Sequence, residues 1–385
     1  MSARPDQRLA HKYRFDDADM DLFFMAALSW GPCGGLDIGQ AYHVASKIVD
    51  GDPESWVRSF TSYGELQDAQ AEAWKARGWK RAAGEARLKA FAAQRSAWQF
   101  AAPGPAFAAL VEKQRATFRK AMEELELPAT FFDAPYAGGT LPGVFFRSAR
   151  PGAPVVLVIG GADTSFEDLF LGVGRNLLDR GYSVAIADVP GQGLQQAMGM
   201  YWETQAEKPI GAVIDVLVDR FGARPGRIAL MGLSLGGYFV TRAAGHEKRL
   251  AAVIATTPFP RPGELFAKAV ESAAAARQPA TPAQRRAREI SMWKMGARTA
   301  EEFIARSAAM VADPSLVSVP FLSVVGTGDS PIFVAQAHEW HEAIGSRVKS
   351  FVTLDASTGA DGHCQVNNRL RLAQEACGWL GEVMP

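Results

Sequence analysis

The stretch Ile228–Phe239, IALMGLSLGGYF, sets a single serine between two leucines, at the end of an apolar run. Four apolar residues followed by this G-x-S-x-G pattern are typical of a buried strand that turns sharply into a helix. Gly232 and Gly236 have no side chains, so the backbone can turn tightly enough to expose Ser234 at the apex. The pattern predicts that Ser234 is a nucleophile and that the amide of Leu235 points to where an oxyanion would form. A glycine-rich turn without any chemistry would give the same pattern.

The composition and charge of the chain limit its partners. The chain has 385 residues, of which 48% are hydrophobic and 21% are charged, so it is long enough for a large catalytic domain and an accessory region. Its 41 basic residues are balanced by 41 acidic residues. This balance gives no electrostatic reason for binding to nucleic acid or to an anionic membrane. We therefore expect a small, largely uncharged molecule as the substrate.

The cysteines and the polar N-terminal stretch bear on cofactors and location. Cys33, Cys364 and Cys377 are scattered and odd in number, which fits neither a disulfide framework nor a zinc site. We expect no metal and no cofactor. The first residues, MSARPDQRLAHKYRFDDADMD, are polar and lack the apolar core of a signal peptide. Since no apolar stretch approaches the ~20 residues that cross a bilayer, we expect a cytoplasmic protein without a membrane partner.

The chain divides into two parts with different sequence patterns. Residues 1–130 carry apolar residues at spacings of three and four, which predicts a helical region. In residues 131–385, short β-rich runs such as VFFRS and PVVLVIGGAD alternate with amphipathic stretches. This alternation predicts an α/β fold with a mostly parallel sheet and helices on both faces. A helical insertion at about 259–315 interrupts the alternation, and we expect it to cover the site.

A nucleophilic serine needs a base, and the base needs an acid to orient it. In proteins that carry a G-x-S-x-G turn on such a sheet, the chain order is serine, acid, histidine. His363 lies in a polar, glycine-rich loop after an apolar run, whereas the other histidines after Ser234 fall within predicted helices: His246, His338 and His341. Asp329 follows the run FLSVVG, one predicted strand before the one leading to His363. We therefore predict a Ser234–Asp329–His363 triad, with other acids as weaker candidates: Asp313, Asp355 and Asp361.

The loop after the run VVLVI predicts the second oxyanion donor. Gly160 and Gly161 free its backbone, so that the amide of Ala162 can point at the oxyanion. Asp163 follows, and a carboxylate there would repel the developing charge unless it is protonated, turned away or used on the substrate. It can equally belong to the start of the next helix, where two pairs fit a capping box: Thr164 with Glu167, or Ser165 with Asp168. Tyr201 and Trp202, after the motif ADVPGQG, are candidates to line the pocket.

Together these residues resemble the α/β-hydrolases related to 2,6-dihydroxypseudooxynicotine hydrolase, a group that includes fermentation-respiration-switch-type esterases and fungal polyketide-shortening hydrolases. The resemblance covers nearly the full chain, through FFMAALSWGPCGGLDIG, GDPESWVRSF, VIGGADTSFED, ADVPGQG, GLSLGG, GTGDSP and the DGH loop. It implies a helical N-terminal region that forms a wall of the site, a triad on Ser234, Asp329 and His363, and a homodimer. It also implies an extra acidic residue at Asp163, where the pseudooxynicotine hydrolase has a longer Glu.

These patterns predict a serine hydrolase that acts on a small apolar carbonyl compound through an acyl-enzyme. The resemblance extends this to cleavage of a carbon–carbon bond in an aryl or polyketide-like ketone. A carboxylesterase or an acyltransferase uses the same residues, so both stay open as alternatives. A noncatalytic ligand receptor on the same fold is a third alternative, and it predicts an incomplete triad or a blocked pocket.

Overall fold

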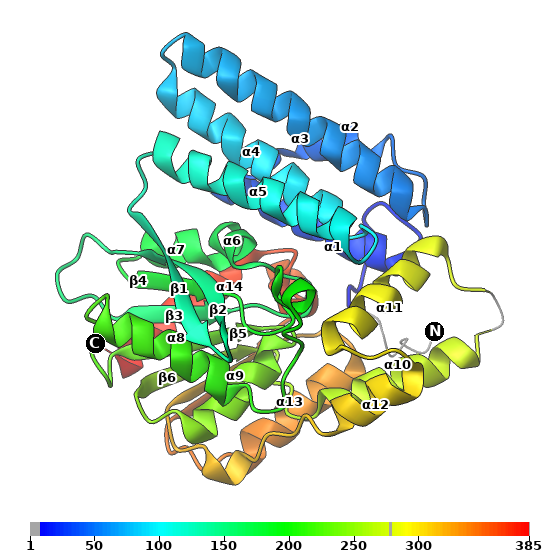
Figure 1. Ribbon diagram of the computed structural model, residues 1–385. Coiled ribbons are helices and arrows are strands. Elements are labelled where there is room, and N and C mark those ends of the chain that lie inside the picture. The colour runs from blue at the N-terminus through cyan, green and yellow to red at the C-terminus, as the bar shows by residue number, and fades with distance from the viewer. Residues whose placement is uncertain (1–7, 277–278, 385) are drawn as a thin grey trace. The chain divides into compact units, whose positions relative to one another are not determined.

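The computed structural model describes residues 8–276 and 279–384 (Figure 1). Contacts between residues divide this part of the chain into two compact units. The catalytic unit contains residues 8–10, 130–276 and 292–384, and the helical unit contains residues 11–129 and 279–291.

The helical unit consists mainly of three long helices that pack along one another. Its elements are α1 (Ala18–Ser29), η1 (Gly31–Cys33), α2 (Ile38–Ala45), α3 (Pro53–Ala76), α4 (Lys80–Trp98) and α5 (Pro105–Glu124). Helix α3 begins at Pro53 because the Asp52 carboxylate accepts a hydrogen bond from the Glu54 amide and proline fits the first helical position. The first part of α11 (Pro282–Met295) also belongs to this unit.

Buried aromatic rings and one ion-pair cluster hold these helices together. Trp56 packs against Phe60 and Phe100, and its indole N–H donates to the Ser96 carbonyl at 2.7 Å. The Arg87 guanidinium, which is 2% exposed, pairs with three carboxylates on α3 and α5: Asp68, Glu72 and Glu124. A buried cation is tolerated only when it is paired, so Arg87 fixes how α4 lies between its neighbours.

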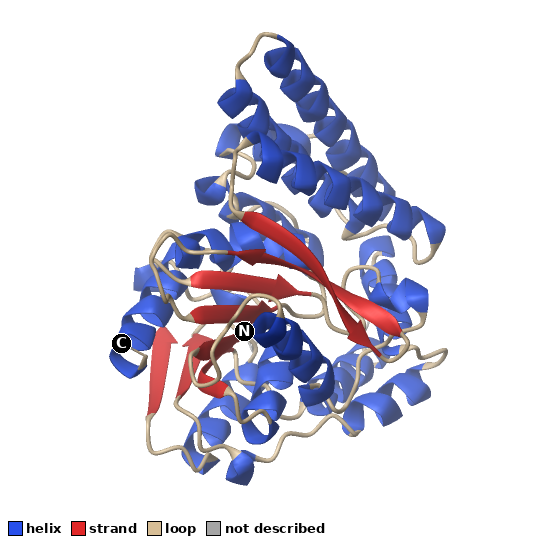
Figure 2. Ribbon diagram, turned by 60° about the vertical axis from the view of Figure 1, so that its left-hand side comes forward, coloured by secondary structure: helices blue, strands red, loops and turns tan. Residues whose placement is uncertain are grey.

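The catalytic unit is built on an eight-stranded sheet in the order β1-β2-β4-β3-β5-β6-β7-β8. Its strands are β1 (Ala129–Tyr136), β2 (Gly139–Phe146), β3 (Val155–Ile159), β4 (Ser183–Ala187), β5 (Ile228–Leu233), β6 (Leu250–Thr256), β7 (Phe321–Gly326) and β8 (Lys349–Leu354). Strands β3 to β8 run parallel and β2 pairs antiparallel with β4. Figure 2 shows this twisted sheet with helices against it. The predicted α/β-hydrolase fold class is confirmed.

Helices cover both faces of the sheet. The elements after β3 are α6 (Phe166–Leu169), the π-helical η2 (Phe170–Gly174), α7 (Arg175–Leu178), η3 (Gln195–Met198), α8 (Glu207–Asp219), α9 (Gly236–His246), α10 (Pro262–Ala274), α11, α12 (Ala300–Ala308), η4 (Pro314–Leu316), α13 (Pro331–Ala343), η5 (Ala356–Thr358), η6 (His363–Gln365) and α14 (Arg369–Val383). Helices α8, α9 and α13 lie over one face, and α6, α7 and α14 over the other (Figure 1). Strands β3, β4, β5 and β7 are therefore buried along their whole length.

Two elements differ from the simple alternation of the sequence. Strand β1 precedes the first predicted run VFFRS and contains Pro135, which suits its place at the edge of the sheet, where part of its surface is exposed. The segment after β3 is divided by the π-helical turn Phe170–Gly174 instead of forming one α-helix.

Within residues 8–276 and 279–384, no helix is long and apolar enough to cross a membrane.

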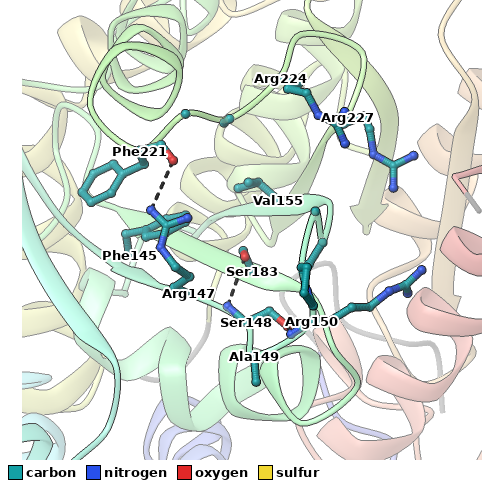
Figure 3. A pocket seen from close by; sticks show the side chains of 15 residues that line it. Phe145, Arg147, Ser148, Ala149, Arg150, Val155, Ser183, Phe221, Arg224 and Arg227 are labelled. Carbon is teal, nitrogen blue, oxygen red and sulfur yellow. Dashed lines mark hydrogen bonds between the residues drawn. The ribbon is translucent and has the colours of Figure 1, made fainter.

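A hollow of about 180 Å³ lies at the amino ends of β3, β4 and β5 (Figure 3). Its lining includes four arginines: Arg147, Arg150, Arg224 and Arg227. Arg147 donates to the Phe221 carbonyl at 3.3 Å. The hollow contains no predicted site residue, since those residues follow the carboxyl ends of the strands, where parallel sheets place their ligands.

Candidate active site

Ser234 stands directly after β5, in the tight turn that leads into α9. Its φ is +58°, a left-handed conformation that costs a residue with a side chain about 1–3 kcal/mol. A Cβ on Gly232 would lie 2.3 Å from the Gly236 carbonyl oxygen, which explains why the turn needs glycine there. The Ser234 N–H donates to the Thr256 carbonyl at 2.9 Å, so the turn is tied to the end of β6.

His363 and Asp329 complete a chain of hydrogen-bonding contacts with this serine. His363 Nε2 lies 2.9 Å from Ser234 Oγ, and His363 Nδ1 lies 2.8 Å from Asp329 Oδ2. The Asp329 carboxylate also accepts from the Thr257 hydroxyl at 3.2 Å and from the Ser330 amide at 2.8 Å. Histidine and aspartate are both buried, whereas the serine is half-buried. The structure thus brings together the three residues that the sequence predicts for the triad.

The order of the strands explains how residues so distant in sequence meet. Strands β5, β6, β7 and β8 are neighbours, and their carboxyl ends share one edge. Asp329 lies in the loop after β7, and His363 lies beyond β8. The backbone N–H of His363 donates to the Arg8 carbonyl at 2.8 Å, which anchors the histidine loop to the N-terminal segment of the same unit. The acid candidates Asp313 and Asp355 cap short 3₁₀ helices instead.

The surroundings of His363 act on its pKa in opposite directions. Burial has the largest single effect and lowers the pKa. The carboxylate of Asp329 and the adjacent Cys364 act against burial and together outweigh it, so the pKa of His363 lies above its ordinary value of 6.5. By contrast, burial and the nearby Lys349 lower the pKa of His341, whose ring contacts Phe351 on another part of the surface.

Two backbone amides beside Ser234 are open to an acceptor. Within the described part of the chain, no carbonyl or side chain accepts from the N–H of Leu235 or of Ala162. A Cβ on Gly161 would lie 2.5 Å from Ser234 Cβ, so the loop before Ala162 runs directly against the nucleophile. Amides that are unpaired and close to a nucleophilic oxygen are the elements of an oxyanion hole.

The other predicted site residues lie on loops of the same unit. Asp163 Oδ1 is 3.8 Å from the ammonium of Lys294, which is 1% exposed. The capping box of the following helix is formed by Ser165 and Asp168, so Asp163 does not take part in it. Trp202 is buried, and its ring lies parallel to that of Phe266 with 6.2 Å between the ring centroids. It is therefore part of the hydrophobic core. The half-buried ring of Tyr201 contacts Gly296.

Three residues beside the triad were not predicted from the sequence. Gln192 donates to the carbonyls of Gly160 and Gly161, and Lys294 donates to the carbonyl of Ala162. The Cys364 thiol donates to the Thr256 carbonyl and accepts from the Ser234 amide, each at 3.0 Å. The position of Cys364 next to His363 could have indicated its place in the site. Gln192 could have been found only through its position in the PGQG loop, and nothing in the sequence pointed to Lys294.

Comparison with known proteins identifies the family. A family model described as "Serine aminopeptidase, S33" matches residues 149–357, which is more than half of the chain. Alpha/beta hydrolase psoB of Aspergillus fumigatus is 31% identical over 268 residues, covering 64% of this chain and 59% of that protein. The 20-hydroxy-prefusarin hydrolase FUS2 of Gibberella moniliformis is 32% identical over 235 residues, covering 57% of this chain and 56% of that protein. The matches thus span less than two thirds of the length of these relatives.

Solved structures confirm the fold. The crystal structure of 2,6-dihydroxy-pseudo-oxynicotine hydrolase is similar with a TM-score of 0.74 and 22% identity, covering 92% of this chain and 95% of that chain. The structure of AbyA5 is similar with a TM-score of 0.65 and 19% identity, covering 88% of this chain and 87% of that chain. The resemblance predicted from the motifs is confirmed in fold and family. The chain belongs to the serine aminopeptidase S33 family of α/β-hydrolases.

Proposed function

We propose that the protein is a serine hydrolase that forms an acyl-enzyme on Ser234. The observation that carries this proposal is the continuous chain of contacts from Ser234 Oγ through the His363 ring to Asp329, with distances of 2.9 Å and 2.8 Å. A serine hydroxyl becomes nucleophilic when an adjacent base takes its proton and an acid holds that base in the required orientation. All three side chains stand in hydrogen-bonding positions for these roles.

The reaction begins when His363 Nε2 accepts the Ser234 proton and Oγ bonds to the substrate carbonyl carbon. The carbonyl oxygen becomes an oxyanion, which the amides of Leu235 and Ala162 stabilise. Asp329 stabilises the imidazolium that forms. When the bond to the leaving group breaks, the leaving atom takes the proton from Nε2. Water then attacks the acyl-enzyme by the same route, releasing a carboxylic acid and free Ser234.

For the substrate, we propose a small apolar ketone that is cleaved between the carbonyl carbon and the neighbouring carbon. This rests on the motif resemblance and on the names of the similar proteins, which include 20-hydroxy-prefusarin hydrolase and 2,6-dihydroxy-pseudo-oxynicotine hydrolase. The leaving carbon bears a negative charge before it is protonated. A 1,3-diketone or a dihydroxyaryl ketone delocalises that charge and is therefore the chemical class that we expect.

Carboxyl ester hydrolysis and acyl transfer are the alternative reactions of the same residues. An ester needs no delocalised carbanion, and in acyl transfer an alcohol or amine replaces the water. A noncatalytic receptor predicts a broken triad, and the contacts between Ser234, His363 and Asp329 argue against it.

Rapid mixing with p-nitrophenyl acetate and a panel of ketones tests the proposal. We expect a burst of about one nitrophenol per protein chain, followed by slower turnover, because this activated ester should acylate Ser234 faster than water hydrolyses the acyl-enzyme. We also expect a 1,3-diketone or a dihydroxyaryl ketone to exceed matched esters in kcat/KM. Preference for esters would favour the esterase alternative, and product formed only with an added alcohol or amine would favour the acyltransferase. Absence of both burst and turnover would contradict the proposal.

The pH dependence of kcat/KM follows from the raised pKa of His363. The ring accepts the Ser234 proton only when it is neutral, so activity rises with pH through the pKa of His363 in the free enzyme. Because that pKa lies above 6.5, we expect the acidic limb of the kcat/KM profile above pH 6.5. His341→Gln is the matched control and should leave the limb in place. A limb at or below pH 6.5 would show that burial outweighs the Asp329 carboxylate in setting the pKa of His363, and a limb that moves in His341→Gln would contradict the assignment of His363 as the base.

The role of Asp163 distinguishes ketone cleavage from ester hydrolysis. Its carboxylate is held near Lys294 at 3.8 Å, and we propose that it also contacts a polar group of the ketone substrate. Asp163→Asn should then lower kcat/KM for the ketone by about tenfold or more and for p-nitrophenyl acetate by less than about threefold, as expected for one lost charged hydrogen bond. Equal losses on both substrates would show that Asp163 acts on Lys294 alone.

A further inference from the structure

The Gln192 side chain crosses from the loop after β4 to the loop after β3. The residue is 1% exposed, and its Nε2 donates to the Gly160 carbonyl at 2.6 Å and to the Gly161 carbonyl at 2.9 Å. The Val189 N–H donates to Gln192 Oε1 at 3.0 Å. Because that oxygen is the acceptor, the amide nitrogen must face the two carbonyls. Gln192 therefore fixes the orientation of two successive peptide groups.

The planarity of the peptide group carries this orientation to Ala162. The Gly161 carbonyl and the Ala162 N–H belong to one peptide unit, which is trans. In a trans peptide the C=O and N–H bonds point in opposite directions. A side chain that holds the carbonyl on one side of the loop therefore directs the N–H to the other side. The same holds for the Gly160 carbonyl and the Gly161 N–H.

Ser234 lies against this loop through the α-carbon of Gly161. A Cβ on Gly161 would be 3.0 Å from Ser234 Oγ, and the Ala162 N–H has no acceptor within the described residues. We propose that Gln192 is a positioning residue, which directs the Ala162 amide at the oxyanion of the reacting substrate. This inference rests on the proposed function, because an oxyanion forms only if Ser234 attacks a carbonyl.

A second buried side chain holds the next peptide group of the same loop. The ammonium of Lys294 donates to the Ala162 carbonyl and lies 3.8 Å from the Asp163 carboxylate. The carbonyls of residues 160–162 are thus held by Gln192 and by Lys294 of α11, and the Thr164 hydroxyl also donates to the Gly161 carbonyl at 3.2 Å. Lys294 also offsets the negative charge of Asp163 beside the place where the oxyanion forms. The loop is oriented before the substrate binds, which is what electrostatic stabilisation of a transition state needs.

Gln192→Leu tests the proposal with the ketone or ester that the wild-type protein turns over fastest. Loss of one oxyanion donor costs about 10²- to 10³-fold in kcat, and a misdirected donor should cost roughly 10- to 100-fold. We expect this loss in kcat while KM stays within about twofold, because the contact strengthens only in the transition state. The inhibition constant of a trifluoromethyl ketone, whose hemiketal carries an oxyanion, should rise by a similar factor.

Gln196→Leu is the matched control. Gln196 is also buried, lies four residues further on, and donates to the Gly193 carbonyl at 2.9 Å, outside the loop of residues 160–162. This variant should keep kcat within about threefold. An equal loss of kcat in both variants would overturn the proposal, as would a folded Gln192→Leu protein with wild-type kcat or with a loss confined to KM.

Gln192→Glu provides a second test with the same side-chain shape. A neutral carboxyl group can donate to one of the two carbonyls, whereas a carboxylate cannot donate and repels both. The ratio of its kcat/KM to that of wild type should therefore fall as the pH rises, and a ratio independent of pH would contradict the proposal. A Ser234→Ala protein with wild-type turnover would instead overturn the proposed function itself. Failure of the Gln192 proposal and failure of the proposed function are therefore distinguishable.

Discussion

Ser234→Ala lowers kcat by roughly 10⁵- to 10⁶-fold in our account, because the substitution removes the oxygen that forms the acyl-enzyme. Its amide still donates to the Thr256 carbonyl, so the turn after β5 should keep its shape. Alanine tolerates the left-handed φ of +58° no worse than serine, and we expect the thermal unfolding temperature to stay close to that of wild type. Steady-state kinetics and a thermal melt on the same preparation measure both quantities.

Ser323→Ala is the matched control for this variant. Ser323 is a fully buried serine of β7, and its hydroxyl has no hydrogen-bond partner within the described residues. It should keep kcat within about twofold. A Ser234→Ala protein that retains more than a tenth of wild-type turnover would show that another residue performs the attack.

Asp329→Asn lowers kcat by about 10⁴-fold, the second largest effect that we expect. The asparagine cannot stabilise the imidazolium, and its amide can donate to His363 Nδ1, which favours the wrong tautomer. Loss of the carboxylate also removes a cause of the raised pKa of His363, so the acidic limb of kcat/KM should move to lower pH. A pH profile of the residual activity measures this displacement.

Asp355→Asn distinguishes the acid of the triad from the other aspartates. Asp355 is exposed and caps η5, where its carboxylate accepts from the Ser357 amide at 3.0 Å. This substitution should change kcat by less than about twofold. If Asp329→Asn reduced activity only tenfold, or left the acidic limb unmoved, His363 would have to be oriented by a different group.

The positions of Ser234, Asp329 and His363 in the fold could be predicted because chemistry and strand pattern coincide in this sequence. Asp329 and His363 each follow an apolar run that is readable as a strand, and consecutive parallel strands bring their carboxyl ends to one edge. The G-x-S-x-G pattern places Ser234 at the same edge. Strand β1 was harder to predict, because an edge strand needs no continuous apolar run and tolerates Pro135.

The side chains around the loop of residues 160–162 could not be predicted from the sequence, because single contacts determine where they lie. Gln192, Gln195 and Gln196 are all buried glutamines of one short segment, and no periodicity shows which of them reaches the loop of residues 160–162. Lys294 reaches Ala162 from the helical insertion across 132 residues of sequence. For Asp163, the sequence left two interpretations open, and the structure excludes it from the capping box while showing its proximity to Lys294.

Covalent labelling with a fluorophosphonate tests the central claim, that Ser234 is an activated nucleophile. The phosphorus should bond to Ser234 Oγ with loss of fluoride, because His363 takes the hydroxyl proton and the oxyanion donors bind the phosphoryl oxygen. Peptide mass spectrometry after digestion locates the adduct. We predict one adduct per chain, on Ser234, with loss of turnover in proportion to labelling. An adduct on another residue that abolishes turnover, or full turnover in a fully labelled protein, would contradict the account.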